Sequence, residues 1–179
     1  MKILTVAGSL FLLSTLVSAE SANLSTPVAI QPNQAVIQVR GVVCSFCAYG
    51  AEKNLSKLSF LDKSQYGDDG VLVDINTHRI TLALQPNKQV GLVKIYDAIK
   101  KGGYDPVKVY LSVYGQVTKK GTEYLLTSST NAQVFILNGQ YVDQLMGKGL
   151  IRVNGFLDAA NIPDIKPGHS VPIQVMEKG

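Results

Sequence analysis

The first half of the chain alternates between two hydrophobic patterns. Stretches with an apolar residue at every second position predict strands, and stretches with apolar residues every three or four positions predict helices. The predicted elements are a strand over 35–40, a helix over 46–58, strands over 71–75 and 80–84, a helix over 88–101 and a strand over 104–111. This β-α-β-β-α-β order is typical of the ferredoxin-like arrangement, an α+β fold with two helices on one face of a small antiparallel sheet.

After residue 111 the pattern changes to short strands separated by turns that carry Gly, Asn and Ser. The predicted strands cover 111–119, 123–128, 133–138, 149–158 and 171–177, and residues 141–146 fit a helical turn. Five short strands favour a small all-β, OB-like barrel, in which Gly155 would let its strand bend. The sequence therefore predicts two units, 35–111 and 112–179.

Residues 1–19 have the pattern of a secretory signal peptide. Lys2 supplies a positive charge, residues 3–17 are mostly apolar, and a small-residue cleavage site ends at Ala19. The apolar run is shorter than the roughly 20 residues that cross a bilayer. We therefore predict a secreted or periplasmic protein with a flexible leader over 20–34 and no stable membrane insertion after cleavage.

The composition argues against several classes of function. The chain of 179 residues has a formal net charge of +4, no dense basic run and no tryptophan, so we expect no binding of nucleic acids. Its two cysteines cannot form a disulfide framework, and a hydrophobic core must stabilise the fold. Acidic residues are scattered and no Ser-His-Asp grouping is visible, so we predict that the protein is not an enzyme.

Both cysteines lie in the segment "CSFC", at Cys44 and Cys47. This segment joins the first predicted strand to the first turn of a helix, where unpaired N–H groups and the helix dipole favour thiolate over thiol. Two thiolates without a third ligand suit one soft ion, copper(I) or mercury(II). Zinc usually needs four ligands and fits less well, because His78 and His169 fall in predicted turns where we expect them to be exposed.

The same stretch resembles the heavy-metal-associated domain of copper chaperones, copper-ATPase amino-terminal modules and the periplasmic mercury-binding protein. The family pattern is roughly G-M-T-C-x-x-C, followed by an apolar residue, E-K and a leucine. Here the matching residues are "GVVCSFC" at 41–47, Ala51, Glu52-Lys53 and Leu55, with "IKKGGYD" at 99–105 downstream. The resemblance covers about residues 35–110, and Val42 and Val43 replace the family's Met and Thr. It implies a ferredoxin-like fold and metal binding by both cysteines.

Three further residues are candidates for the surroundings of the metal. The resemblance places Tyr104 beside the metal loop, although a core aromatic with an exposed hydroxyl would equally explain it. Lys101 is placed to offset the charge of a bis-thiolate complex, or it is a solvated lysine at a helix end. Phe46 lies between the cysteines and is bulky enough to shield the sulfurs.

Two other functions remain open for the cysteine pair. Thioredoxin-like thiol-disulfide oxidoreductases also place C-x-x-C between a strand and a helix, but the predicted hairpin, helix and strand do not follow their order. Alternatively, the protein is a non-catalytic docking protein in which Cys44 and Cys47 form a disulfide. The loop closed by such a disulfide is small, so the disulfide would stabilise the fold only slightly. The metal-binding interpretation implies a metal transporter or another periplasmic protein as the partner.

Overall fold

The computed structural model describes residues 28–166 and 168–176. The predicted signal peptide and most of the predicted leader lie outside the described residues. In chain order the first elements are β1 (Gln34–Arg40), α1 (Ser45–Leu55), β2 (Val71–Asp74), β3 (Arg79–Ala83), α2 (Leu92–Lys101) and β4 (Asp105–Lys120), with an irregular turn, η1, at Tyr66–Gly70. This order confirms the predicted β-α-β-β-α-β succession.

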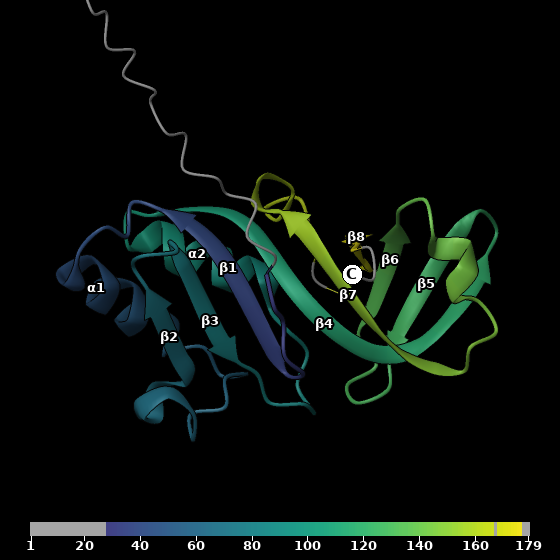
Figure 1. Ribbon diagram of the computed structural model, residues 1–179, viewed down its shortest axis with the longest axis horizontal. Helices are drawn as coiled ribbons and strands as arrows, with labels where there is room; N and C mark the ends of the chain where they lie inside the picture. Colours follow the sequence, from purple (N-terminus) through teal and green to yellow (C-terminus); the bar gives the residue numbers. More distant parts are fainter. Residues whose placement is uncertain (1–27, 167, 177–179) are drawn as a thin grey trace, which may run out of the picture.

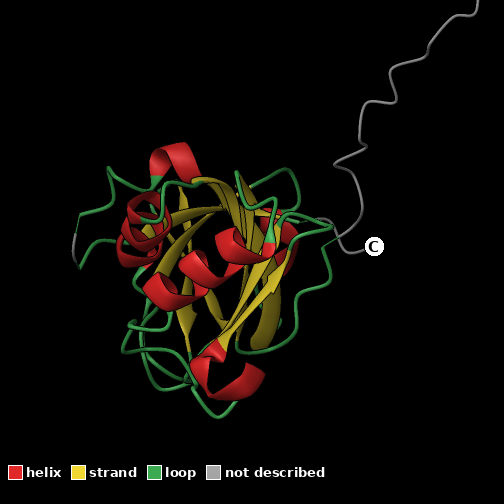
Figure 2. Cartoon of the chain, turned by 90° about the vertical axis from the view of Figure 1, so that its left-hand side faces the viewer, coloured by secondary structure: helices red, strands yellow, loops and turns green. Residues whose placement is uncertain are grey.

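The strands of this part form the order β2-β3-β1-β4 with antiparallel pairing throughout. The helices α1 and α2 pack against each other, α1 also contacts β2 and α2 contacts β4, so both helices cover the same side of the sheet. Figures 1 and 2 show this arrangement from two directions. The loop that carries both cysteines lies between β1 and α1, at one end of the sheet.

The strand β4 is longer than predicted. A single strand of 16 residues replaces the two predicted strands over 104–111 and 111–119. The alternation of buried positions explains this, since it continues through Leu111, Val113, Gly115 and Val117 without interruption. The strand passes through residue 112 without a break, and the division into 35–111 and 112–179 stays a prediction.

The remaining strands are β5 (Glu123–Ser128), β6 (Val134–Asn138), β7 (Leu150–Asp158) and β8 (Val171–Val175), with short helical turns η2 (Val142–Leu145) and η3 (Ala159–Asn161). They follow β4 in the order β4-β5-β6-β8-β7, and β7 also pairs with β4 along Lys108–Gln116. The five strands therefore close into a ring (Figure 1). Within it, β6 and β8 are parallel and the other pairs are antiparallel.

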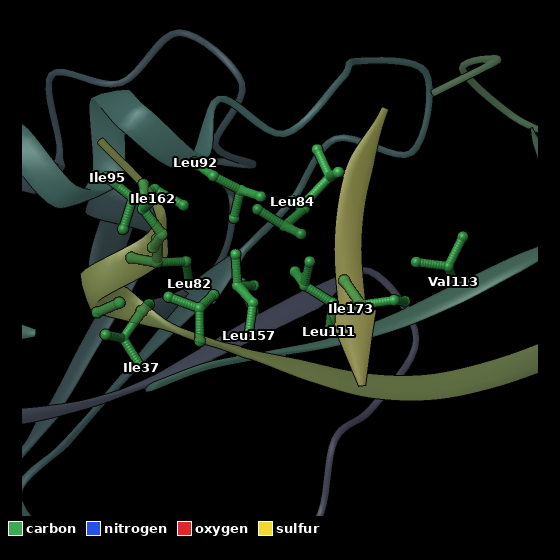
Figure 3. Packing of buried hydrophobic residues seen from close by; sticks show 14 of the residues in the cluster. Ile37, Leu82, Leu84, Leu92, Ile95, Leu111, Val113, Leu157, Ile162 and Ile173 are labelled. Carbon is green, nitrogen blue, oxygen red and sulfur yellow. The ribbon is translucent and has the colours of Figure 1, made fainter. Parts of the chain in front are cut away.

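One hydrophobic cluster runs through both parts of the structure. It includes Ile37 of β1 and Ile95 of α2 as well as Leu157 of β7 and Ile173 of β8 (Figure 3). Burying this shared surface removes apolar area from water, which stabilises the two parts together. Within the described residues, no helix is long and apolar enough to cross a membrane.

The helix α2 begins four residues later than predicted, at Leu92 instead of residue 88. Contacts with the loop before β6 explain this late start. The Asn131 amide donates to the Lys88 carbonyl (2.9 Å), the Val90 N–H donates to Gln133 Oε1 (2.9 Å), and Gln133 Nε2 donates to the Val90 carbonyl (3.1 Å). The carbonyls of Lys88 and Val90 would have been acceptors within a longer helix, and here they accept from the loop before β6.

Candidate metal centre

Cys44 is the residue that caps the start of α1. Its backbone is extended (φ −147°, ψ 164°), its sulfur accepts a hydrogen bond from the Cys47 N–H (3.2 Å), and its carbonyl accepts one from the Ala48 N–H (2.9 Å). The thiol thus takes the role that a serine or aspartate oxygen usually has at a helix start. Cys47 lies one turn further along, so both side chains belong to the same end of the helix.

Both cysteines are free and partly exposed. The pKa of the Cys47 thiol is lowered. The largest cause is a hydrogen bond between the side chains of Cys44 and Cys47, and the next is a hydrogen bond with the backbone of Val43, while partial burial raises the pKa. A lower pKa increases the fraction of thiolate, which is the form that binds soft metals and attacks disulfides. Both thiols are therefore accessible to solvent, and Cys47 forms its thiolate more readily than an unperturbed cysteine does.

The lowered pKa of Cys47 leads to a testable pH dependence. In the Cys44→Ala variant the largest cause of the shift is removed, so the pKa of Cys47 should rise and its thiolate should form only at higher pH. We expect the pH profile of iodoacetamide alkylation at Cys47 to move to higher pH in this variant. An unchanged profile would show that Cys44 does not control the Cys47 thiol; Ser45→Ala serves as the control.

Tyr104 lies beside the cysteine pair. It lies close to three glycines: a methyl group added at Gly41 or Gly102 would lie 3.4 or 2.8 Å from its ring, and one added at Gly50 would lie 3.2 Å from its hydroxyl oxygen. The pKa of the Tyr104 hydroxyl is raised. Burial is the largest cause, and the nearby Cys47 and Cys44 raise the pKa further. The hydroxyl thus stays protonated and can donate toward a thiolate.

The other two candidate neighbours are placed differently. Phe46 is 89% exposed, so its ring contacts little of the protein, and its role in shielding the sulfurs stays a prediction. Residue 46 falls on the solvent side of α1, while Ala51 and Leu55 face the core. Lys101 is exposed at the end of α2, and in the described chain no ion pair joins it to another residue.

His78 belongs to the surroundings of the metal loop, which the sequence did not indicate. It is exposed as predicted, but its ring nitrogen Nδ1 lies 3.3 Å from the carbonyl of Val42, two residues before Cys44. Its backbone carbonyl also accepts a hydrogen bond from the Val39 N–H (2.9 Å). Because a carbonyl can only accept, Nδ1 carries the proton in this contact.

The donor set at this site consists of two sulfurs. In residues 28–166 and 168–176 there is no group of three or more His, Cys, Asp or Glu side chains that could hold a metal ion. Two sulfurs are fewer than the four ligands of a structural zinc site.

The surface around the cysteines is apolar. Val43, Phe46 and Tyr49 are 69%, 89% and 59% exposed, and we call these three residues the loop patch. The amine of Lys53 lies 5.4 Å from the centre of the Tyr49 ring at its border. Large exposed apolar side chains gathered in this way mark surfaces that contact other molecules.

A solved structure is similar to part of the chain. No protein-family model matches the chain, and no curated protein matches its sequence. A solved structure, described as "CopZ metallochaperone", aligns with 22% sequence identity over 41% of this chain and 98% of its own, with a TM-score of 0.35. A similarity at this level does not assign the chain to a family or a function.

Proposed function

We propose that the protein binds one soft metal ion, copper(I) or mercury(II), between Cys44 and Cys47 and delivers it to a partner. The observation that carries this proposal is the position of both cysteines at the start of α1, where Cys44 caps the helix and the pKa of Cys47 is lowered. Soft ions prefer thiolate ligands, and copper(I) and mercury(II) accept two of them. Tyr104 would donate to the charged sulfurs, and its rigid packing would keep the loop in shape.

Delivery would proceed by exchange of thiolates. A thiolate of the partner binds the ion while Cys44 and Cys47 still hold it, one cysteine then leaves and is free to take up a proton, and a second partner ligand replaces the other cysteine. The ion keeps its charge, and nothing is oxidised or reduced. The exposed loop patch would bring the partner close enough for this exchange. A metal transporter or another exported protein fits this role, in keeping with the predicted signal peptide.

The proposed function assigns different roles to the two parts of the chain. Residues 35–111 would form a heavy-metal-associated unit with a ferredoxin-like fold, in agreement with the strand order β2-β3-β1-β4. The ring of five strands would be an OB-type barrel, supported by its closure through β4 and β7 and by its parallel pair β6–β8. Without a basic groove visible in the sequence, we assign it a docking role and no enzymatic activity.

A second candidate function is thiol-disulfide exchange. The lowered pKa of Cys47 and the accessible pair favour it, since both properties increase attack on disulfides. An oxidised pair that only supports docking is a third candidate. The three functions require different states of the sulfurs. Metal delivery requires reduced sulfurs that bind the ion, thiol-disulfide exchange requires sulfurs that alternate between reduced and oxidised, and the docking function requires an oxidised pair.

Two measurements on the reduced protein, made without oxygen, separate these functions. Titration of the protein with copper(I) in competition with a chelator should give one tightly bound ion per chain. A separate titration with mercury(II) should give the same stoichiometry. In an insulin-reduction assay with dithiothreitol the protein should not exceed the uncatalysed rate. Rapid insulin reduction together with weak metal binding would replace the proposal by the oxidoreductase function.

A further inference from the structure

A second candidate site lies away from the cysteines, where the two parts of the chain meet. It is a cavity of about 640 Å³ lined by the Ser59–Phe60 turn, the start of α2, the start of β6 and the segment that leads into β8. This volume is within the usual range of small-molecule sites, which is about 300–1,000 Å³. None of the cavity-lining residues belongs to the metal loop.

The charged residues of the cavity wall all have the same sign. Lys88, Lys94 and Lys166 line it, and no Asp or Glu is among the described residues that do. None of the three lysines forms an ion pair with any residue that the structure describes. The Lys88 amine donates to the Ser59 carbonyl at 3.2 Å, which orients its charge without neutralising it. A concave surface with charges of one sign concentrates the field and attracts ions of the opposite sign.

The rest of the wall is largely apolar and well supported. Phe60, Val90, Leu92 and Val171 are among its residues. Two hydrogen bonds join Gln133, just before β6, to the backbone of Val90, just before α2. They connect the cavity wall formed by the ring of strands to the wall formed by the first part of the chain. Gln133 is 9% exposed and both bonds are partly shielded from water, so they keep the cavity in one shape. A site formed before binding loses less entropy when a ligand enters it.

We propose that this cavity binds a small organic anion, a phosphate ester or a carboxylate attached to an apolar group. The lysines would hold the anionic group, and the apolar wall would cover the rest of the ligand. A concave site of this size, made from four separate segments of the chain, fits a small molecule better than an acidic peptide. The proposal is independent of metal binding by the cysteines.

The test uses phenyl phosphate as a probe in NMR titrations of the ¹⁵N-labelled mature protein. We expect saturable shifts of amide signals in residues 88–94, 165–166 and 168–171, and much weaker ones with benzyl alcohol, which lacks the charge, or with inorganic phosphate, which lacks the ring. The Lys94→Gln, Lys166→Gln double variant should bind about tenfold more weakly, because two favourable charge interactions are lost.

Matched controls make the result decisive. The Lys119→Gln, Lys120→Gln variant removes the same charge at the end of β4, outside the cavity, and should bind phenyl phosphate as the unmodified protein does. Equal weakening in both double variants, equal binding of benzyl alcohol, or shifts outside the cavity would each overturn the proposal. Binding of an acidic peptide in place of phenyl phosphate would also overturn it. The Cys44→Ser, Cys47→Ser variant should retain phenyl phosphate binding, which separates this test from that of the metal site.

Discussion

Replacing Cys44 with serine should lower the affinity for copper(I) by about 10²- to 10⁴-fold, since one of two linked ligands is lost and the remaining thiolate binds without its neighbour's high local concentration. Serine is a favourable residue at a helix start, and its oxygen can accept the Cys47 N–H bond that the sulfur accepts now. The helix α1 should therefore keep its cap. The loss of copper(I) affinity would then result from the missing sulfur ligand and not from a change in folding.

The measurement for this variant is a competition titration with a copper(I) chelator under reducing conditions. Ser45→Ala is the control, because it changes the exposed neighbour of Cys44 and leaves both sulfurs in place. Circular dichroism should give the same helix content for all three proteins. If Cys44→Ser binds copper(I) as tightly as the unmodified protein, then Cys44 is not a ligand.

Replacing Gly115 with alanine should destabilise the fold by about 3 kcal/mol, the upper part of the usual range for overpacking. A methyl group at this position would lie 2.1 Å from the carbonyl oxygen of Thr127 on the paired strand β5. That contact is with backbone, so no side-chain rotation relieves it. The strand β4 belongs to both parts of the structure, and the effect should appear as one loss of stability for the whole protein.

Urea unfolding followed by circular dichroism measures this effect. Gly147→Ala is the control, because that glycine has a positive φ of 73° and no neighbour within 4 Å of an added methyl group. The control should lose only about 1 kcal/mol, which is the usual cost of a left-handed backbone with a side chain. Similar losses in both variants would show that β4 and β5 do not approach each other at Gly115 as described.

Much of the fold was predictable because local patterns determine it. The alternation over 35–40 and the helical spacing of Ala51 and Leu55 correspond to β1 and α1 within a few residues. The helix α1 ends at Leu55 instead of residue 58, since the Leu58 N–H turns back to the Leu55 carbonyl (2.9 Å). The late start of α2 depends on Asn131 and Gln133, some forty residues away, and no local pattern contains that information.

The candidate site was predictable in part for the same reason. The spacing of Cys44 and Cys47 and the helix that follows them are local features, and they place both sulfurs at one helix end. His78 was missed as a neighbour of the metal loop because the turn between β2 and β3 reaches Val42 only in the folded chain. The exposure of Phe46 was missed because its helix buries a different face.

The cavity beside α2 was not predictable from any motif. Lys88 and Lys94 are isolated in the sequence and have the character of solvated surface lysines. Only the fold, which brings residues 165–166 and 168–171 near the start of α2, places Lys166 at the same cavity. Long-range contacts of this kind follow from the shared core and the closed ring of strands, which bring together segments that are distant in sequence.

The central claim is that Cys44 and Cys47 together bind one soft metal ion. The most direct test is anaerobic copper(I) titration of the reduced mature protein beside its Cys44→Ser, Cys47→Ser variant, with a chelator competing for the ion. We expect one tightly bound copper(I) ion per chain in the unmodified protein and none in the variant. Equal stoichiometry in the two proteins would contradict it.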